Sequence, residues 1–283
     1  MNSKNPYLNL KDHSVSGEQF QLFYNDQLDM LETFPQPSEE HLGQYYKTED
    51  YISHTDSKRN VMEYAYHFVR QITLKRKVKL INKYSNLGKC LLDIGCGTGD
   101  FLKVASNNGW EISGFEPNDI AREIANKKTN NSVLHSDALF ELENEQFDVI
   151  TLWHVLEHLP NLEKHIVTLN RLLKPNGTLL IAVPNFKSFD AVYYKSFWAA
   201  YDVPRHLWHF SKTSIFKLFA KHKLDLVETK PMMFDSFYVS LLSEKYKTGF
   251  MNPFRAFWIG LWSNIKGMQT KEYSSHIYIL QKE

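Results

Sequence analysis

The feature that most constrains the fold is the stretch LLDIGCGTGD, residues 91–100, in which Gly95, Gly97 and Gly99 follow a short apolar run. Glycine allows a sharp turn and lets a ligand approach the backbone where a Cβ atom would collide. The dinucleotide spacing G-x-G-x-x-G would need its third glycine at Asp100, and the Gly-Lys-Ser/Thr of a phosphate-binding loop is missing. We therefore expect a strand, a tight ligand-binding turn and a helix, but neither a dinucleotide-binding motif nor a phosphate-binding loop.

Apolar periodicity predicts that strands and helices alternate along the rest of the chain. The expected strands are 90–94, 111–115, 132–135, 147–152, 178–183, 224–229 and 276–280. The expected helices are 59–84, 98–107, 118–128, 162–173 and 211–222, with an aromatic, helical insert at 234–266. Regular β-α-β alternation indicates a parallel sheet with helices on both faces, and the right-handed crossover rule makes a doubly wound sheet the default.

Composition narrows the class of protein. The chain has 283 residues, of which 43% are hydrophobic, so it can bury a sizeable core. Its net charge of +1 makes nucleic acid an unlikely partner. Its only cysteines, Cys90 and Cys96, form no disulfide framework, and we find neither a signal-peptide pattern nor an apolar run of about 20 residues. We expect a cytoplasmic protein without a membrane span.

Three acidic residues stand at the predicted carboxyl ends of successive strands. Asp93 precedes the glycine turn, Glu116 closes the second strand, and Asp137 closes the third. Open α/β sheets bind their ligands along this edge. A carboxylate at Glu116 can accept both hydroxyls of a ribose, and one at Asp137 can accept from an adenine amino group.

In combination these motifs resemble the class I S-adenosylmethionine-dependent methyltransferases. The similar stretches are LLDIGCGTGDFL, GFEPN, SDALFEL…FDVITLWHVLEHL and LNRLLKPNGTLLIAVPN, which together cover about residues 85–230. The resemblance implies an α/β, Rossmann-like, doubly wound sheet of seven strands with the last strand antiparallel. It implies S-adenosylmethionine as cofactor and S-adenosylhomocysteine as its product. The implied cofactor-binding residues are Asp93, Gly95, Cys96, Gly97, Gly99, Glu116, Pro117, Asp137, Ala138 and Trp153.

The segment LWHVLEHLP, residues 152–160, also fits the H-x-x-E-H signature of a zinc protease. That site needs both histidines on one continuous helix, and Pro160 does not suit such a helix. In the methyltransferase register the segment instead ends the fourth strand beside both substrates. We then expect His154 as the first candidate for a catalytic base and His158 as the next. Some relatives use a carboxylate and a histidine here to hold a divalent metal, which we do not expect in this chain.

A second cluster lies in SFWAAYDVPRHLWHFS, residues 196–211, which resembles a segment of a bacterial methyltransferase group. We expect this segment, within a lid at 186–210, and the insert at 234–266 to cover the acceptor pocket. The expected acceptor-binding residues are Trp198, Tyr201, Arg205 and His209, and His206 is the alternative base. For Arg205, binding of an anionic acceptor and pairing with Asp202 both stay open.

The predicted organisation is an N-terminal cap at 1–57 and a methyltransferase domain at 58–283. The same bacterial group often begins with a zinc-binding segment, but this chain has Asn25 and Leu28 where a cysteine pair is expected, so we predict a cap without metal. The predicted activity is methyl transfer from S-adenosylmethionine to oxygen on a small-molecule or sugar-like acceptor. The alternatives are a non-catalytic module that binds S-adenosylmethionine and a nicotinamide-dependent oxidoreductase. The oligomeric state is left open.

Overall fold

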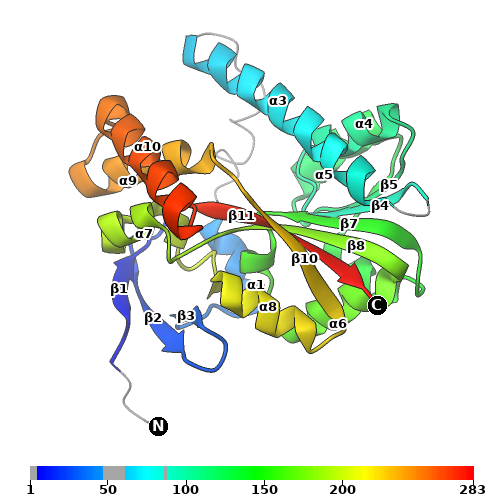
Figure 1. The fold of residues 1–283 in the computed structure, drawn as a ribbon, viewed down its shortest axis with the longest axis horizontal. Coiled ribbons are helices and arrows are strands. Elements are labelled where there is room, and N and C mark those ends of the chain that lie inside the picture. Colours follow the sequence, from blue (N-terminus) through cyan, green and yellow to red (C-terminus); the bar gives the residue numbers. More distant parts are fainter. Residues whose placement is uncertain (1–4, 47–60, 86–87) are drawn as a thin grey trace.

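The computed structural model describes residues 5–46, 61–85 and 88–283, and its centre is a seven-stranded sheet (Figure 1). The sheet order is β10-β11-β8-β7-β4-β5-β6. The strands are β4 (Cys90–Ile94), β5 (Glu111–Phe115), β6 (Val133–Leu134), β7 (Phe147–Trp153), β8 (Leu173–Pro184), β10 (Leu224–Pro231) and β11 (Ser275–Lys282). β4 to β8 pair in parallel, and β11 runs antiparallel to both β8 and β10. The expected fold class is confirmed.

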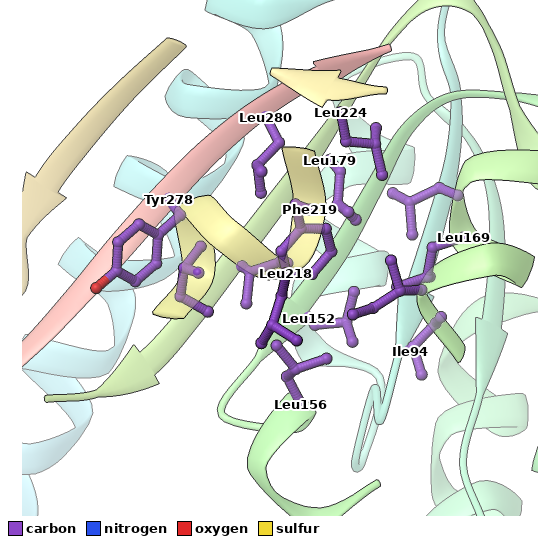
Figure 2. Close-up of a cluster of buried hydrophobic side chains, with 14 of the residues drawn as sticks. Ile94, Leu152, Leu156, Leu169, Leu179, Leu218, Phe219, Leu224, Tyr278 and Leu280 are labelled. Carbon is purple, nitrogen blue, oxygen red and sulfur yellow. The ribbon is translucent and has the colours of Figure 1, made fainter. Parts of the chain in front are cut away.

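Helices cover both faces of this sheet. One face carries α3 (Val61–Tyr84), α4 (Asp100–Asn107) and α5 (Asp119–Thr129), and the other carries α6 (Leu162–Leu172) and α8 (Lys212–Ala220) (Figure 1). The period of two along β8 explains how one strand serves both layers, because Leu179 and Ile181 join one core and Leu180 joins the other. Figure 2 shows the α6–α8 core, where Leu169 and Phe219 meet Leu152 and Leu179.

The N-terminal segment forms a second sheet, which the sequence did not predict. Its order is β1 (Leu8–Lys11), β2 (Gln19–Asn25), β3 (Met30–Phe34) and β9 (Trp208–His209), all antiparallel. The Asn25 carboxamide accepts the N–H groups of Gln27 and Leu28 in the turn between β2 and β3. Short elements α1 (Glu39–Leu42) and η1 (Gly43–Tyr45) follow. The predicted boundary between residues 57 and 58 lies outside the described residues.

The aromatic segment at 186–210 packs against the N-terminal sheet. It contains α7 (Phe189–Tyr194), η4 (Lys195–Phe197) and η5 (Ala199–Tyr201). Phe186, Tyr194 and Trp198 are buried in one cluster with Leu22 and Leu31 of the N-terminal sheet. The cap and the segment therefore stabilise each other, because each covers apolar surface that the other exposes.

The insert before the last strand contains two packed helices, α9 (Asp235–Thr248) and α10 (Pro253–Thr270). They lie at the edge of the molecule beside α7 (Figure 1). The prediction of a helical insert at 234–266 is thus correct in type and about four residues short at its end. Across residues 5–46, 61–85 and 88–283, no helix is both long and apolar enough to cross a membrane.

Candidate functional site

The glycine loop between β4 and α4 has a left-handed backbone at each of its three glycines. The φ angles are +65° at Gly95, +54° at Gly97 and +75° at Gly99. A Cβ atom on Gly95 would lie 2.4 Å from Val155 Cγ2, and one on Gly99 would lie 2.9 Å from Ala125 Cβ. A Cβ atom on Gly97 would meet nothing within 4 Å. The outer glycines are therefore needed for packing, whereas Gly97 faces open space that a ligand can fill.

The buried carboxylate of Glu116 ties this loop to the end of β5. Its Oε2 accepts the N–H of Gly97 at 2.9 Å, and its Oε1 accepts the N–H of Asn118 at 3.0 Å. The carbonyl of Phe115 accepts the N–H groups of Gly95 and Cys96. Pro117 follows directly. The two strand ends thus present a glycine loop and an acid at one edge, as the sequence predicts.

Asp93, at the end of β4, is buried beneath the loop. Thr151 Oγ1 donates to its Oδ1 at 2.6 Å. Burial raises the pKa of Asp93 to about 7, although Thr151 and Lys77 favour the charged form. Asp93 is therefore a buried acid between Thr151 and Lys77, on the strand that leads into the loop.

Lys77 of α3 is a site residue that sequence reasoning missed. The stretch 75–79 reads as a solvated basic face, but Lys77 Nζ lies 4.2 Å from the ring centroid of Trp153. Burial lowers the pKa of Lys77 to about 8, against the carboxylates of Asp93 and Asp235. The Trp153 Nε1–H is buried without a hydrogen-bond partner among the described residues. A cation and a vacant donor therefore lie together beside the loop.

The predicted adenine-side residues lie in η2 (Ser136–Glu141), just after β6. The Asp137 side chain is 93% exposed and its Oδ2 lies 3.1 Å from His135 Nδ1. Ala138 is partly buried against the core. Both residues lie at the ligand edge of the sheet, and the carboxylate of Asp137 is accessible to a ligand.

The histidine segment after β7 is not a continuous helix. His154 has a φ of +58°, and only Leu156–His158 (η3) is helical, as a single 3-10 turn. This backbone rules out the helix that a zinc-protease H-x-x-E-H needs. His154 Nε2 lies 3.1 Å from Asp235 Oδ2 of α9, and its Nδ1 lies 3.4 Å from Glu157 Oε1. Burial alone would lower the pKa of His154, but these carboxylates raise it to about 10.

Glu157, His158 and His206 form a compact cluster next to this ion pair, in which Glu157 and His206 are buried and His158 is partly buried. One ligand atom from each lies within 4.8 Å of the others. His158 Nδ1 donates to the carbonyl of Arg205 at 3.1 Å, and His206 Nδ1 donates to the carbonyl of Ala200 at 2.9 Å. A carbonyl only accepts, so each ring carries a proton on Nδ1, and the Tyr46 hydroxyl, 3.0 Å from His158 Nδ1, accepts from the same N–H. When the His158 ring is neutral, its Nε2 is the acceptor.

Electrostatics keep the His158 ring neutral near pH 7. Burial and the neighbouring His206 lower the pKa of His158 to about 4. Glu157 is 1% exposed, and neither of its carboxylate oxygens accepts a hydrogen bond from the described residues. Burial would raise the pKa of Glu157, but His154 and His206 hold it below its ordinary value. The site thus combines a charged carboxylate with a neutral imidazole.

The four predicted acceptor-binding residues are buried, and each has a partner within the protein. Arg205 is buried, and its guanidinium donates to Asp202, to Asp12 and to the carbonyl of Tyr45. Of the two roles left open for Arg205, the structure supports pairing with Asp202, because the carboxylates of Asp202 and Asp12 already neutralise the guanidinium charge. The remaining three are buried in the same region, where Trp198 donates to Asp190, Tyr201 packs edge-to-face against Trp198, and His209 contacts Thr33 Oγ1. Sequence could not separate them from ligand contacts, because aromatic composition is the same in a core and in a pocket.

The strand order, the single antiparallel strand, the glycine loop and the acid after β5 place the chain among the class I methyltransferases, which use S-adenosylmethionine. A family model described as a methyltransferase domain matches residues 65–229, more than half of the chain. The chain belongs to this family.

Relatives of known function match parts of the chain. A ubiquinone biosynthesis O-methyltransferase of Pasteurella multocida is 33% identical over 35% of this chain and 47% of its own length. A demethylmenaquinone methyltransferase of Staphylococcus aureus is 28% identical over 50% of this chain and 62% of its own length. The chain therefore spans only about half to three fifths of these curated relatives.

Solved structures share the fold. A magnesium protoporphyrin IX methyltransferase of Synechocystis, solved with bound S-adenosylhomocysteine, aligns with a TM-score of 0.55 at 16% identity, over 83% of this chain and 94% of that one. At this identity the likeness shows the fold alone.

Proposed function

We propose that this protein transfers the methyl group of S-adenosylmethionine to a hydroxyl oxygen of a small, quinone-type or phenol-like acceptor. The observation that carries the proposal is the loop at Gly97, which opens to space directly above the buried Glu116 carboxylate. The names of the relatives, a ubiquinone and a demethylmenaquinone methyltransferase, support the acceptor class.

Donor binding would use the groups around the loop. Glu116 would accept the ribose hydroxyls, and Gly95, Gly97 and Gly99 with Cys96 and Pro117 would line the donor. Asp137 and Ala138 would meet the adenine. Lys77 and the vacant Nε1–H of Trp153 would face the polar end of the methionine part, since a carboxylate needs a cation or donors when it leaves water.

The reaction needs alignment and one proton transfer. The acceptor oxygen attacks the methyl carbon, a new O–C bond forms, and the S–C bond breaks with its electron pair returning to sulfur. A neutral imidazole Nε2 takes the hydroxyl proton. His158 is the proposed base, because its ring is neutral and it is less buried than His206.

For the two first candidates we propose the reverse of the expected order. A histidine with a pKa of about 10 is already protonated at neutral pH, so His154 has no vacant nitrogen with which to accept a proton. As an imidazolium it would instead hold Glu157 and Asp235 in place.

A divalent metal is the second candidate for activating the hydroxyl, favoured by the cluster of Glu157, His158 and His206. Two imidazoles and a buried carboxylate, with one ligand atom of each within 4.8 Å of the others, form a donor set that fits zinc, iron or manganese. The backbone carbonyls on each Nδ1–H supply the outer contacts that such ligands usually have. A bound metal would lower the pKa of the acceptor hydroxyl. Metal analysis of purified protein, with activity measured before and after chelation, separates this route from direct base catalysis.

The donor site is tested first, by calorimetric titration with S-adenosylmethionine and S-adenosylhomocysteine. We expect both to bind the wild type and the Glu116→Ala variant to lose about 1–3 kcal/mol, the cost of leaving polar partners unsatisfied. Glu123→Ala is the matched control, because Glu123 is an exposed residue on α5 with only a Lys127 partner. Absence of binding by well-folded wild type would contradict the proposal.

Turnover separates the remaining alternatives. A non-catalytic module would bind the donor but release no S-adenosylhomocysteine with any phenolic acceptor. A nicotinamide-dependent oxidoreductase would instead bind reduced nicotinamide cofactor, which its own fluorescence reports. Asp100 at the position of the third glycine weighs against the latter.

A further inference from the structure

The helices α9 and α10 bury mostly small and polar residues and expose large apolar ones, which is the reverse of an ordinary surface helix. The face that α10 buries consists of small or polar residues: Ala256, Gly260, Ser263, Asn264 and Gly267. The face that it exposes carries large apolar ones: Phe254, Phe257, Trp258, Trp262 and Met268, together with Phe250 and Met251 in the preceding turn. We call these seven residues the hairpin face. Their spacing at 254, 257, 258, 262 and 268 makes one continuous stripe along α10.

The exposure is concentrated in this part of the molecule. Of the eighteen large apolar side chains that are exposed among the described residues, ten lie between Met233 and Met268. Phe254 is 75% exposed and Trp258 is 54% exposed. Monomeric proteins in water rarely leave such a contiguous apolar surface open, and where they do it is a docking surface.

The hairpin is held together mainly through its buried face. A Cβ atom on Gly260 would lie within 3.0 Å of the Phe237 backbone, so α9 and α10 approach closely over small residues. Asn264 Nδ2 donates to the carbonyl of Met233 and to Ser236 Oγ, and Ser263 Oγ donates to Asp190. The fold therefore needs the buried polar face, and the exposed aromatic stripe is left for another role.

The charge of the segment selects the partner. Residues 245–271 contain five basic residues and no acidic one: Lys245, Lys247, Arg255, Lys266 and Lys271. Arg255 pairs with the buried Glu244, whereas Lys266 Nζ lies 5.7 Å from the ring centroid of Trp262, beside the hairpin face. A Trp- and Phe-rich stripe bordered by lysines is the pattern of helices that lie in the interface of an anionic bilayer.

We propose that the hairpin face docks this protein onto an anionic phospholipid membrane, with α10 lying in the plane of the interface. The inference does not depend on the proposed reaction. Docking would bring the candidate site close to the membrane, because Asp235, the first residue of α9, pairs with His154 in that site. The docked helices would then lie between a lipid-soluble acceptor in the bilayer and the candidate site, which α9 contacts through Asp235.

The test is flotation of the full chain with large unilamellar vesicles of phosphatidylcholine, with and without phosphatidylglycerol. We expect the wild type to float with the anionic vesicles and to be released by high salt. A Phe254→Ser/Trp258→Ser variant should lose at least about ten-fold in vesicle affinity, since each aromatic buried in lipid contributes roughly that factor. The charge variant Lys247→Gln/Lys266→Gln should lose affinity for anionic vesicles only.

Phe216→Ser is the matched control, because Phe216 is a similarly exposed aromatic side chain, at 56%, but lies on α8 outside the hairpin. Its vesicle binding should equal that of the wild type. Brominated lipids should quench the wild-type fluorescence, and Trp258→Phe/Trp262→Phe should lose that quenching. The proposal is overturned if the wild type stays unbound, or if the Phe254→Ser/Trp258→Ser variant floats as well as the wild type. It is also overturned if the wild type is a dimer that ignores vesicles and this variant is a monomer, because a second copy would then cover the face.

Discussion

Replacing the middle glycine of the loop should separate ligand binding from folding. Gly97 and Gly249 both have positive φ, +54° and +86°, and a Cβ atom on either would meet nothing within 4 Å. An alanine in a left-handed backbone costs about 1–2 kcal/mol, so Gly97→Ala and Gly249→Ala should lose similar amounts of unfolding free energy. Gly95→Ala should lose more, because its Cβ would also collide with Val155 at 2.4 Å.

Ligand binding should distinguish Gly97→Ala from Gly249→Ala, for which we expect similar losses of unfolding free energy. The new methyl group at residue 97 would occupy the space proposed for the donor, and overfilling a fitted space costs about 1–3 kcal/mol. We therefore expect Gly97→Ala to bind S-adenosylhomocysteine roughly 5- to 150-fold more weakly than Gly249→Ala. Urea unfolding measures the first quantity and calorimetric titration the second. Equal affinity of the two variants would refute our placement of the donor at Gly97.

Three further predictions concern the histidines and the arginine. His158→Gln should reduce kcat by about 10²–10⁴-fold and leave the affinity for S-adenosylhomocysteine unchanged, and an unaltered kcat would exclude His158 as the base. The pKa of His154, raised from 6.5 to about 10, implies stabilisation that is complete below pH 6.5 and is lost as pH rises to about 10. The loss of unfolding free energy in Asp235→Asn should accordingly shrink across that range, and a loss that stays constant would contradict the ion pair. Arg205→Met should cost about 3–5 kcal/mol, since it leaves the carboxylates of Asp12 and Asp202 without their partner, whereas a cost within experimental error would restore the role in acceptor binding.

Local pattern was sufficient for the sheet and for its ligand edge. The central parallel strands β4 and β7 are short runs rich in apolar residues, and a left-handed turn such as that at Gly95 and Gly99 accepts only glycine without strain. Glu116 was also found from the sequence, because it directly follows the run that forms β5, and the end of that strand fixes where the residue lies. The sequence by itself therefore determined the class of protein and the cofactor edge.

Tertiary structure decided what depends on residues far apart in the chain. Arg205 and Asp12 are 193 residues apart, and β3 pairs with β9 across a similar distance, so neither contact leaves a local signal. The protonation of His154 depends on Asp235 of α9, and the contact of Lys77 with the Trp153 ring depends on where α3 lies over the sheet. Charge, pKa and exposure are properties of the folded environment. For that reason the sequence located the candidate histidines, but only the fold showed which of them is neutral.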